Sequence, residues 1–160
     1  QQRSVPCAAP LASLLDLLPT LCGLAGVPGP SKTEGVNLAP FLGGAPAPER
    51  PYVASEWLTE WGFTYSPGRM IRTERFKYIR YREGNGEALY DLVNDPGEQC
   101  NCAADSAFVD ELIRHRALLE QHVAATADDF FTREASVASR WRTHTPGWQH
   151  HRGIAAPMEG

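Results

Sequence analysis

The chain has 160 residues, of which 42% are hydrophobic and 21% are charged, and its formal net charge at pH 7 is −4. These values are ordinary for a globular protein, and a chain of this length can bury about two-thirds of its unfolded surface. The small negative charge gives no reason to expect a polyanion as partner, and no apolar run is long enough to span a membrane. The sequence opens on Gln1 rather than Met, so we expect a fragment of a longer protein.

The first expected element is a helix over residues 13–25. Ser13 and Asp16 have the spacing of a capping box, and Pro19 is tolerated only in the first turn. Gly26 is typical of the residue that ends a helix. Because leucines surround this helix almost completely, we expect it to require burial on several sides. Its apolar residues recur at helical spacing, at Leu14, Leu17, Leu18, Leu21, Leu24 and Ala25.

Four strands are expected after a loop rich in Gly and Pro. The loop covers residues 27–51 and has room for one helical turn within residues 36–42. Gly84-Asn85-Gly86 is a hairpin signal, and the turn-forming residues Asn94 to Gly97 end the last strand. The composition therefore predicts an antiparallel meander. Its strands are expected at residues 52–57, 69–73, 76–82 and 88–93.

A second helix is expected from about Ser106, with Asp105 or Ser106 itself as its cap. Its apolar residues form a single stripe, so one face should be buried. We therefore predict an α+β fold, in which an amphipathic helix packs on an antiparallel sheet of about four strands. The stripe consists of Phe108, Leu112, His115, Leu119 and Val123.

Three stretches of the sequence together resemble the sulfatase family. LYDLVNDPGEQCN, at residues 89–101, resembles the signature LYDL-x-x-DP-x-E-x-x-N near the C-terminal end of that family. RMIRTERFKYIRY resembles the hairpin before it, and SLLDLLPTLCGLAGVPGP followed by EGVNLAPFLGG resembles the segment that leaves the catalytic domain. Together they cover roughly residues 11–124.

The resemblance implies an alkaline-phosphatase-like α/β fold and sulfate-ester hydrolysis for the parent enzyme. Residues 1–50 would then be the end of the catalytic α/β domain and a linker. Residues 51–127 would be the C-terminal antiparallel subdomain with its helix, and residues 128–160 a tail. We expect the partner to be a missing N-terminal catalytic domain, and the parent's substrate to be a small-molecule sulfate ester. The sequence leaves open whether the protein forms a homo-oligomer and in which cellular compartment it resides.

The family's catalytic groups are not expected in this chain. Sulfatases use a formylglycine made within Cys/Ser-x-Pro/Ala-x-Arg, together with a calcium ion held by acidic side chains and an amide. We interpret Asp128 and Asp129 as a solvated helix end, because a hard cation needs six or so oxygen ligands. The chain alone is therefore expected to be inactive. The motif is absent around all four cysteines, which also lack zinc or redox spacing: Cys7, Cys22, Cys100 and Cys102.

Four residues are candidates for binding the organic part of a substrate. Glu56 and Trp57 stand at the exit of the first strand, before an aromatic loop that could either stack on a ligand or pack a small core. His150 and His151 lie in the tail, where Pro146-Gly147 would let the chain return toward that loop. Imidazole side chains suit a sulfated or anionic group, although an irregular tail of scattered polar residues stays the alternative.

Two other functions remain open. A phosphonate or phosphate monoester hydrolase of the same superfamily would share these C-terminal motifs, and a non-catalytic interaction module could derive from a sulfatase. A third function, nucleic-acid binding by the basic hairpin at residues 69–82, is disfavoured. The hairpin's cations are divided between its two faces, and Glu74, Glu83 and Glu87 dilute them.

Overall fold

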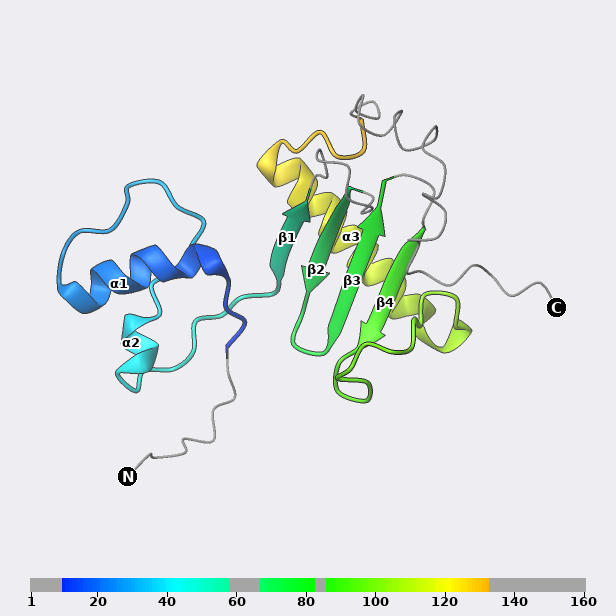
Figure 1. Ribbon diagram of the computed structural model, residues 1–160, viewed down its shortest axis with the longest axis horizontal. Helices are drawn as coiled ribbons and strands as arrows, with labels where there is room; N and C mark the ends of the chain where they lie inside the picture. The colour runs from blue at the N-terminus through cyan, green and yellow to red at the C-terminus, as the bar shows by residue number, and fades with distance from the viewer. Residues whose placement is uncertain (1–9, 58–66, 83–85, 133–160) are drawn as a thin grey trace, which may run out of the picture. The chain divides into compact units, whose positions relative to one another are not determined.

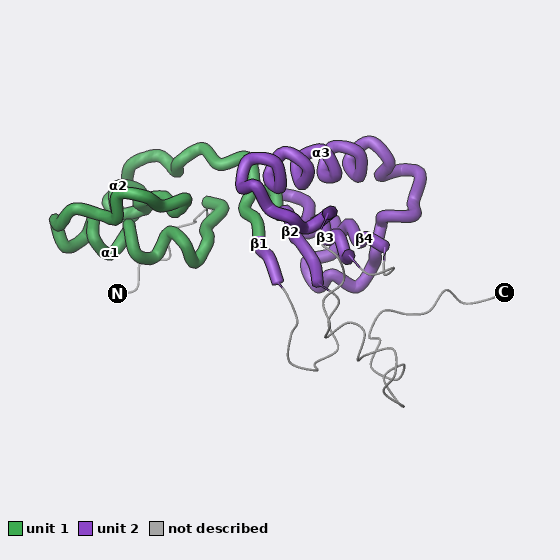
Figure 2. The backbone as a smooth tube through the Cα atoms, turned by 90° about the horizontal axis from the view of Figure 1, so that it is seen from above, with its two compact units in different colours: residues 1–54, 72–74 green, residues 55–71, 75–160 purple. Residues whose placement is uncertain are grey.

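The computed structural model describes residues 10–57, 67–82 and 86–132 (Figure 1). The chain forms two compact units, one of residues 1–54 and 72–74 and the other of residues 55–71 and 75–160 (Figure 2). The first unit contains the leucine-rich helix, and the second contains most of the sheet and the long helix. The predicted division into residues 1–50, 51–127 and 128–160 stays a prediction.

In the first unit, the predicted helix begins with the 3-10 turn η1 (Leu14–Asp16) and continues as α1 (Leu17–Ala25). The capping box is confirmed, because Ser13 accepts a hydrogen bond from a backbone amide while the Asp16 carboxylate accepts one from the Ser13 N–H at 2.7 Å. Gly26 ends the helix with a φ of 67°, a left-handed conformation that glycine adopts without steric cost. The short helix α2 (Ala39–Leu42) lies within the predicted range.

The interior of this unit is polar. The Asp16 side chain is 2% exposed and accepts two hydrogen bonds of 2.7 Å from the Arg50 guanidinium. It also accepts one from the Val36 N–H at 2.8 Å, and the Thr20 hydroxyl accepts one from the Leu38 N–H at 2.9 Å. Burial acts to raise the pKa of Asp16, but these bonds from Arg50 and from backbone amides outweigh it and lower the pKa to about 2.

The leucines of the first unit lie on its surface. Leu17 and Leu18 are each 58% exposed, Leu21 is 53% exposed and Leu24 is 60% exposed, while Leu14 in η1 is 90% exposed. The helix is thus oriented by the hydrogen bonds of Asp16 and Thr20, and its leucines are not covered by the part of the chain that the structure describes.

In the second unit, the predicted meander is confirmed (Figure 1). β1 (Val53–Trp57), β2 (Gly68–Arg72), β3 (Phe76–Tyr81) and β4 (Glu87–Asp91) are neighbours in that order. β3 and β4 pair antiparallel with Phe76 opposite Asp91. After a short turn, η2 (Ser106–Phe108), the helix α3 (Val109–Thr126) runs along one face of the sheet. No helix among the described residues has the length and apolarity needed to cross a membrane.

The core of the second unit lies between the sheet and α3. The predicted stripe on α3 is confirmed, since Leu112, His115 and Leu119 are no more than 5% exposed. Phe76 packs edge to face against the His115 ring at 5.7 Å between centroids. Burial lowers the pKa of His115, so this imidazole stays neutral at pH 7. The other deeply buried residues of this core are Ile71, Tyr78, Leu89 and Phe130.

The last strand ends at Asp91, two residues earlier than predicted. The Asp91 carboxylate accepts hydrogen bonds from the Val93 N–H at 3.2 Å and the Asn94 amide at 2.8 Å, and the Asp91 carbonyl accepts one from the Asp95 N–H at 2.7 Å. One further backbone bond joins the two segments, from the Leu92 N–H to the Arg75 carbonyl at 2.8 Å, and beyond it these local bonds turn the chain away. Arg75 stabilises the turn by donating two further hydrogen bonds to the Asp91 carboxylate, at 3.1 and 2.7 Å.

Asn101 then closes the outer edge of β4. Its Oδ1 accepts a hydrogen bond from the Leu89 N–H at 3.0 Å, and its Nδ2 donates one to the Glu87 carbonyl at 3.2 Å. Glu98 receives a salt bridge of 2.5 Å from Lys77 on β3. The polar residues of the LYDL-x-x-DP-x-E-x-x-N stretch are therefore engaged in shaping a corner of the sheet.

Candidate functional site

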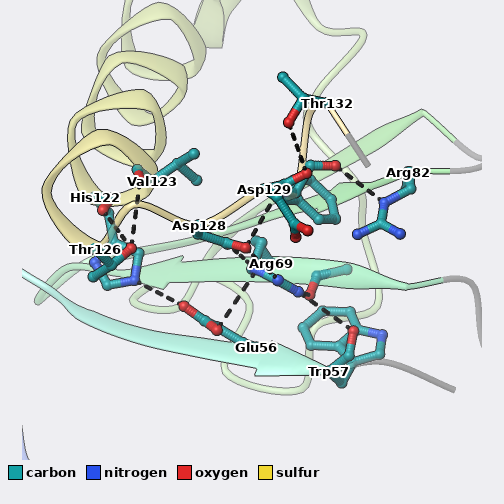
Figure 3. A network of polar contacts seen from close by, with 12 residues as sticks. Glu56, Trp57, Arg69, Arg82, His122, Val123, Thr126, Asp128, Asp129 and Thr132 are labelled. Atoms are coloured by element: carbon teal, nitrogen blue, oxygen red, sulfur yellow. Dashed lines mark hydrogen bonds and ion pairs between the residues drawn. The ribbon is translucent and has the colours of Figure 1, made fainter. Parts of the chain in front are cut away.

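A buried arginine organises the polar network at one end of β1 and β2 (Figure 3). Arg69 is 3% exposed, and its Nε and Nη2 donate to the two carboxylate oxygens of Asp128 at 2.6 and 2.9 Å. Its Nη1 donates to the carbonyls of Gly68 and Trp57 at 3.0 and 3.5 Å. The bond from Arg69 holds the pKa of Asp128 below its usual range, so the pair stays ionised at neutral pH.

The interpretation of Asp128 as part of a solvated helix end is therefore wrong. Its side chain is 10% exposed, and both of its oxygens bind Arg69, which lies 59 positions away in the sequence. A buried guanidinium requires an opposite charge, and Asp128 supplies it from the segment that follows α3. Asp129 is exposed, as the interpretation had it.

Glu56 connects this arginine to α3. One oxygen of Glu56 lies 3.9 Å from the Arg69 Nε, and the other lies 3.3 Å from the His122 Nε2 (Figure 3). The Glu56 side chain is 45% exposed, whereas the His122 side chain is 12% exposed. Glu56 is one of the predicted substrate-binding residues. Arg69 and His122 hold its side chain in place, and its carboxylate reaches solvent.

Trp57 is half-buried and packs against its own unit. Its indole lies so close to Gly68 that a side chain at that position would collide with the ring. On its other side the ring meets Tyr81 edge to face, at 6.1 Å between centroids. The structure therefore brings Glu56 and Trp57 together with Arg69 and His122. The loop aromatics and the tail residues His150 and His151 lie outside the described residues.

Phe130 separates two guanidinium groups in the same network. Arg69 and Arg82 lie over the Phe130 ring, 4.6 and 5.1 Å from its centroid. The Arg82 Nε donates to the Phe130 carbonyl at 3.0 Å, and its Nη2 is a buried donor with no acceptor among the described residues. The network thus combines two cations, an aromatic ring and two carboxylates, a set suited to fixing a chain turn or an anionic ligand.

A calcium site does not fit the described residues. Within residues 10–57, 67–82 and 86–132, no group of three or more His, Cys, Asp or Glu side chains could hold a metal ion. Asp128 belongs to the only Asp-Asp pair of the sequence, and both oxygens of its carboxylate already accept hydrogen bonds from Arg69. The chemistry of this donor set is that of ion pairs rather than of cation coordination.

The cations of the basic hairpin are largely paired with carboxylates. Arg75 binds Asp91 at 2.7 Å, and Lys77 binds Glu98 at 2.5 Å. Arg69 binds Asp128, as described above. This pairing lowers the positive potential that the hairpin offers to a nucleic-acid phosphate backbone.

The sequence pattern does not single out Arg69, His122 or Asp128 as site residues. The pattern does indicate that Arg69 is buried, because strand alternation places it on the same face as Ile71. A charged residue on a buried face needs an ionic partner. No local signal identifies Asp128 as that partner, because the pairing joins distant segments.

Comparison with known proteins gives consistent results. The family model described as N-sulphoglucosamine sulphohydrolase, C-terminal, matches residues 7–125. The chain is 46% identical over 143 residues to a Delta 4,5-hexuronate-2-O-sulfatase of Bacteroides thetaiotaomicron, spanning 89% of this chain but 30% of the relative. The structure of a 2-O GAG sulfatase aligns with a TM-score of 0.72 at 46% identity, over 89% of this chain and 31% of that one.

A phosphonate monoester hydrolase of Agrobacterium radiobacter also aligns. Its TM-score is 0.52 at 29% identity, over 69% of this chain and 24% of that one. This subdomain therefore also occurs in a phosphonate monoester hydrolase, as the sequence resemblance implies, but the 2-O GAG sulfatase matches it better in both sequence and structure. The chain belongs to the N-sulphoglucosamine sulphohydrolase C-terminal family, the C-terminal part of the alkaline-phosphatase-like sulfatases.

Proposed function

We propose that this chain is the C-terminal subdomain of an enzyme that hydrolyses a sulfate ester on a uronate-containing saccharide. The observation that carries the proposal is the 46% identity, over 89% of the chain, to a Delta 4,5-hexuronate-2-O-sulfatase. Identity at this level over nearly the whole subdomain favours a related substrate class. The phosphonate or phosphate monoester alternative is supported by a lower identity and a lower TM-score.

This chain and the rest of the enzyme would have different roles in catalysis. The chain spans about 30% of the relative's length, none of its four cysteines stands in the nucleophile motif, and its described residues contain no calcium site. The formylglycine and the calcium ion would therefore belong to the catalytic domain. This chain would contribute a rigid sheet and helix that support one side of the substrate pocket.

The exposed leucines of α1 give this division a physical basis. The six leucines of η1 and α1, which are 53–90% exposed, would be an unusual surface for a free-standing module, because contiguous apolar patches normally mark an interface. Packing of α1 against the catalytic α/β domain would cover them. The reading of the chain as an independent, non-catalytic interaction module leaves this surface without a role.

Glu56, Trp57, His150 and His151 remain the proposed substrate-binding residues. A contact from His150 or His151 to the organic part of the substrate would be worth about 1–3 kcal/mol. His150→Ala or His151→Ala in the full-length enzyme should therefore raise KM with little change in kcat, because binding outside the sulfate stabilises substrate and transition state equally. Unchanged kcat and KM in both variants would remove the tail from the substrate site.

A chimera tests the proposed function. The C-terminal region of the Bacteroides thetaiotaomicron sulfatase would be replaced by this chain, and sulfate release from an unsaturated 2-O-sulfated uronyl disaccharide would be measured. We expect the chimera to keep its activity within about tenfold, a loss of about 1.4 kcal/mol in transition-state stabilisation. The truncated enzyme without any C-terminal region, and this chain alone, should release no sulfate.

Two controls make the result decisive. The same replacement with the C-terminal region of the Agrobacterium radiobacter phosphonate monoester hydrolase, which has the same fold, should give a less active chimera. Mass spectrometry should show the formylglycine in every chimera. A soluble chimera of this chain that carries formylglycine but releases no sulfate would contradict the proposal.

A further inference from the structure

A groove in the second unit shares no residue with the network around Arg69. It has a volume of about 260 Å³ and lies between β3 and α3. Pockets that enclose drug-sized molecules have volumes of about 300–1,000 Å³, so this groove suits a single small unit of a longer ligand. Its lining residues are Tyr78 and Arg80 on β3, Arg116, Leu119 and Glu120 on α3, and Phe131 beyond the helix.

The charges of the groove are arranged around Glu87 on β4. Its carboxylate accepts hydrogen bonds from the Arg116 Nε at 2.9 Å and from the Tyr78 hydroxyl at 2.7 Å. The bond from Arg116 holds the pKa of Glu87 below its usual range. Arg80 lies 3.7 Å from Glu87, which is an ion pair but too long for a hydrogen bond. Arg80 therefore keeps its donors for another acceptor, and its side chain is 42% exposed.

The remaining lining residues supply an apolar face and a second carboxylate. Phe131 is 52% exposed, so its ring is available for packing from solvent. Leu119 forms the floor, and the exposed Glu120 stands at the rim. Two guanidiniums against the carboxylates of Glu87 and Glu120 give no net charge, which disfavours a dense polyanion such as a nucleic acid.

We propose that this groove binds one anionic sugar unit, with its carboxylate or sulfate on Arg80, its hydroxyls on Glu120 and its ring against Phe131. An aromatic face beside a solvent-exposed guanidinium and a hydrogen-bond acceptor matches the alternation of C–H faces, acidic groups and hydroxyls along a uronate-containing saccharide. The choice of a sulfated uronate ligand rests on the proposed function. The groove would then bind one sugar of the saccharide at a distance from the sulfate that is hydrolysed.

The test measures binding of a fluorescently labelled, uronate-containing tetrasaccharide that carries a single sulfate to the purified chain, by anisotropy at low protein concentration. Arg80→Ala and Phe131→Ala should each weaken binding at least about fivefold, which corresponds to about 1 kcal/mol. Arg114→Ala is the matched control, because it removes one exposed cation from α3 outside the groove. It should change the affinity less than about twofold, or about 0.4 kcal/mol. Circular dichroism checks that all variants fold.

Two further probes identify the recognised chemistry. A chemically desulfated tetrasaccharide that binds as well as the sulfated one would assign Arg80 to the carboxylate, whereas its loss of binding would assign Arg80 to the sulfate. Equal losses in Arg80→Ala and Arg114→Ala, no loss in Arg80→Ala, or equally tight binding of a single-stranded DNA of similar charge would overturn the proposal. These results do not depend on hydrolysis, so the groove and the proposed function can fail separately.

Discussion

The two units of this chain use their polar and apolar residues in opposite ways. In the first unit, Asp16 and Thr20 are buried while the leucines of α1 are exposed. In the second unit, the apolar stripe of α3 is buried against the sheet, and the buried charges Arg69 and Asp91 lie in ion pairs. A unit with a polar interior and an apolar surface gains little from the hydrophobic effect by itself. The second unit therefore has its own apolar core, whereas the leucines of α1 stay exposed among the described residues.

The largest expected effect comes from breaking the interior of the first unit. Asp16→Ala should leave the Arg50 guanidinium without its partner, at a cost of about 3–5 kcal/mol for an unpaired buried charge. Hydrogen exchange should then show loss of protection in residues 11–50, while residues 86–126 keep theirs. Asp110→Ala, which removes an exposed acid from α3, is the control. Equal loss of protection in both units would show that they unfold together.

Truncating a leucine in each unit compares the two helices directly. Leu119→Ala on α3 removes a side chain that is 1% exposed and should destabilise the second unit by about 2–5 kcal/mol. Leu21→Ala on α1 removes one that is 53% exposed and should change stability by no more than about 0.5 kcal/mol. Denaturant unfolding of the two variants measures both values. A destabilisation by Leu21→Ala as large as that by Leu119→Ala would contradict the contrast.

Acid should weaken the first unit over a defined pH range. The pKa of Asp16 is lowered to about 2 in the folded chain, whereas an unfolded Asp has a value of about 3.9. The stabilisation by ionised Asp16 is therefore complete above about pH 4 and is lost as the pH falls toward about 2. An NMR titration of the Asp16 carboxyl carbon, followed together with the Val36 amide, measures the midpoint. A midpoint near 3.9 would show that the Arg50 pair does not persist in solution.

Substitutions of the exposed leucines of α1 are expected to have the smallest effect on stability. They should nevertheless have a clear effect on self-association. We expect the chain to self-associate or to be poorly soluble through its exposed leucines. Replacing Leu17, Leu18 and Leu21 by Gln should shift sedimentation toward a monomer without loss of helix signal. Ile113→Gln on α3, which is 55% exposed, is the control and should leave association unchanged. A wild-type chain that sediments as a monomer and binds no hydrophobic dye would argue against an interface at α1.

Local chemistry explains how much of the fold the sequence predicts. The capping box at Ser13, the C-cap at Gly26 and the stripe on α3 depend on residues within a few positions of one another, and all three are confirmed. The end of β4 is the exception, since an apolar residue such as Val93 extends the strand pattern although the Asp91 side chain stops the pairing. Strand propensity is weaker than a side chain that competes for the backbone.

The candidate site is less predictable because its contacts are long-range. Glu56 and Trp57 follow from their place at the end of a strand, but their partners come from β2, from α3 and from the segment after it. Asp16 shows the same limit: its capping role is visible in the sequence, whereas its pairing with Arg50 spans 34 positions. Ion pairs of this kind are fixed by the topology and not by any pattern of neighbouring residues.

The hydrogen bonds of Asn101 have a consequence for misfolding. An uncovered edge strand can recruit a strand from another molecule, and such strand addition is the first step toward fibrils. The amide of Asn101 satisfies the Leu89 N–H and the Glu87 carbonyl on the outer side of β4, and the Cys102 N–H binds the Leu89 carbonyl at 2.8 Å. The side chain of Asn101 thus occupies backbone groups of β4 that a strand from another molecule would need for pairing. At Leu89 and Glu87, the asparagine that ends the signature-like stretch therefore leaves this edge of the sheet with fewer backbone groups open to strand addition.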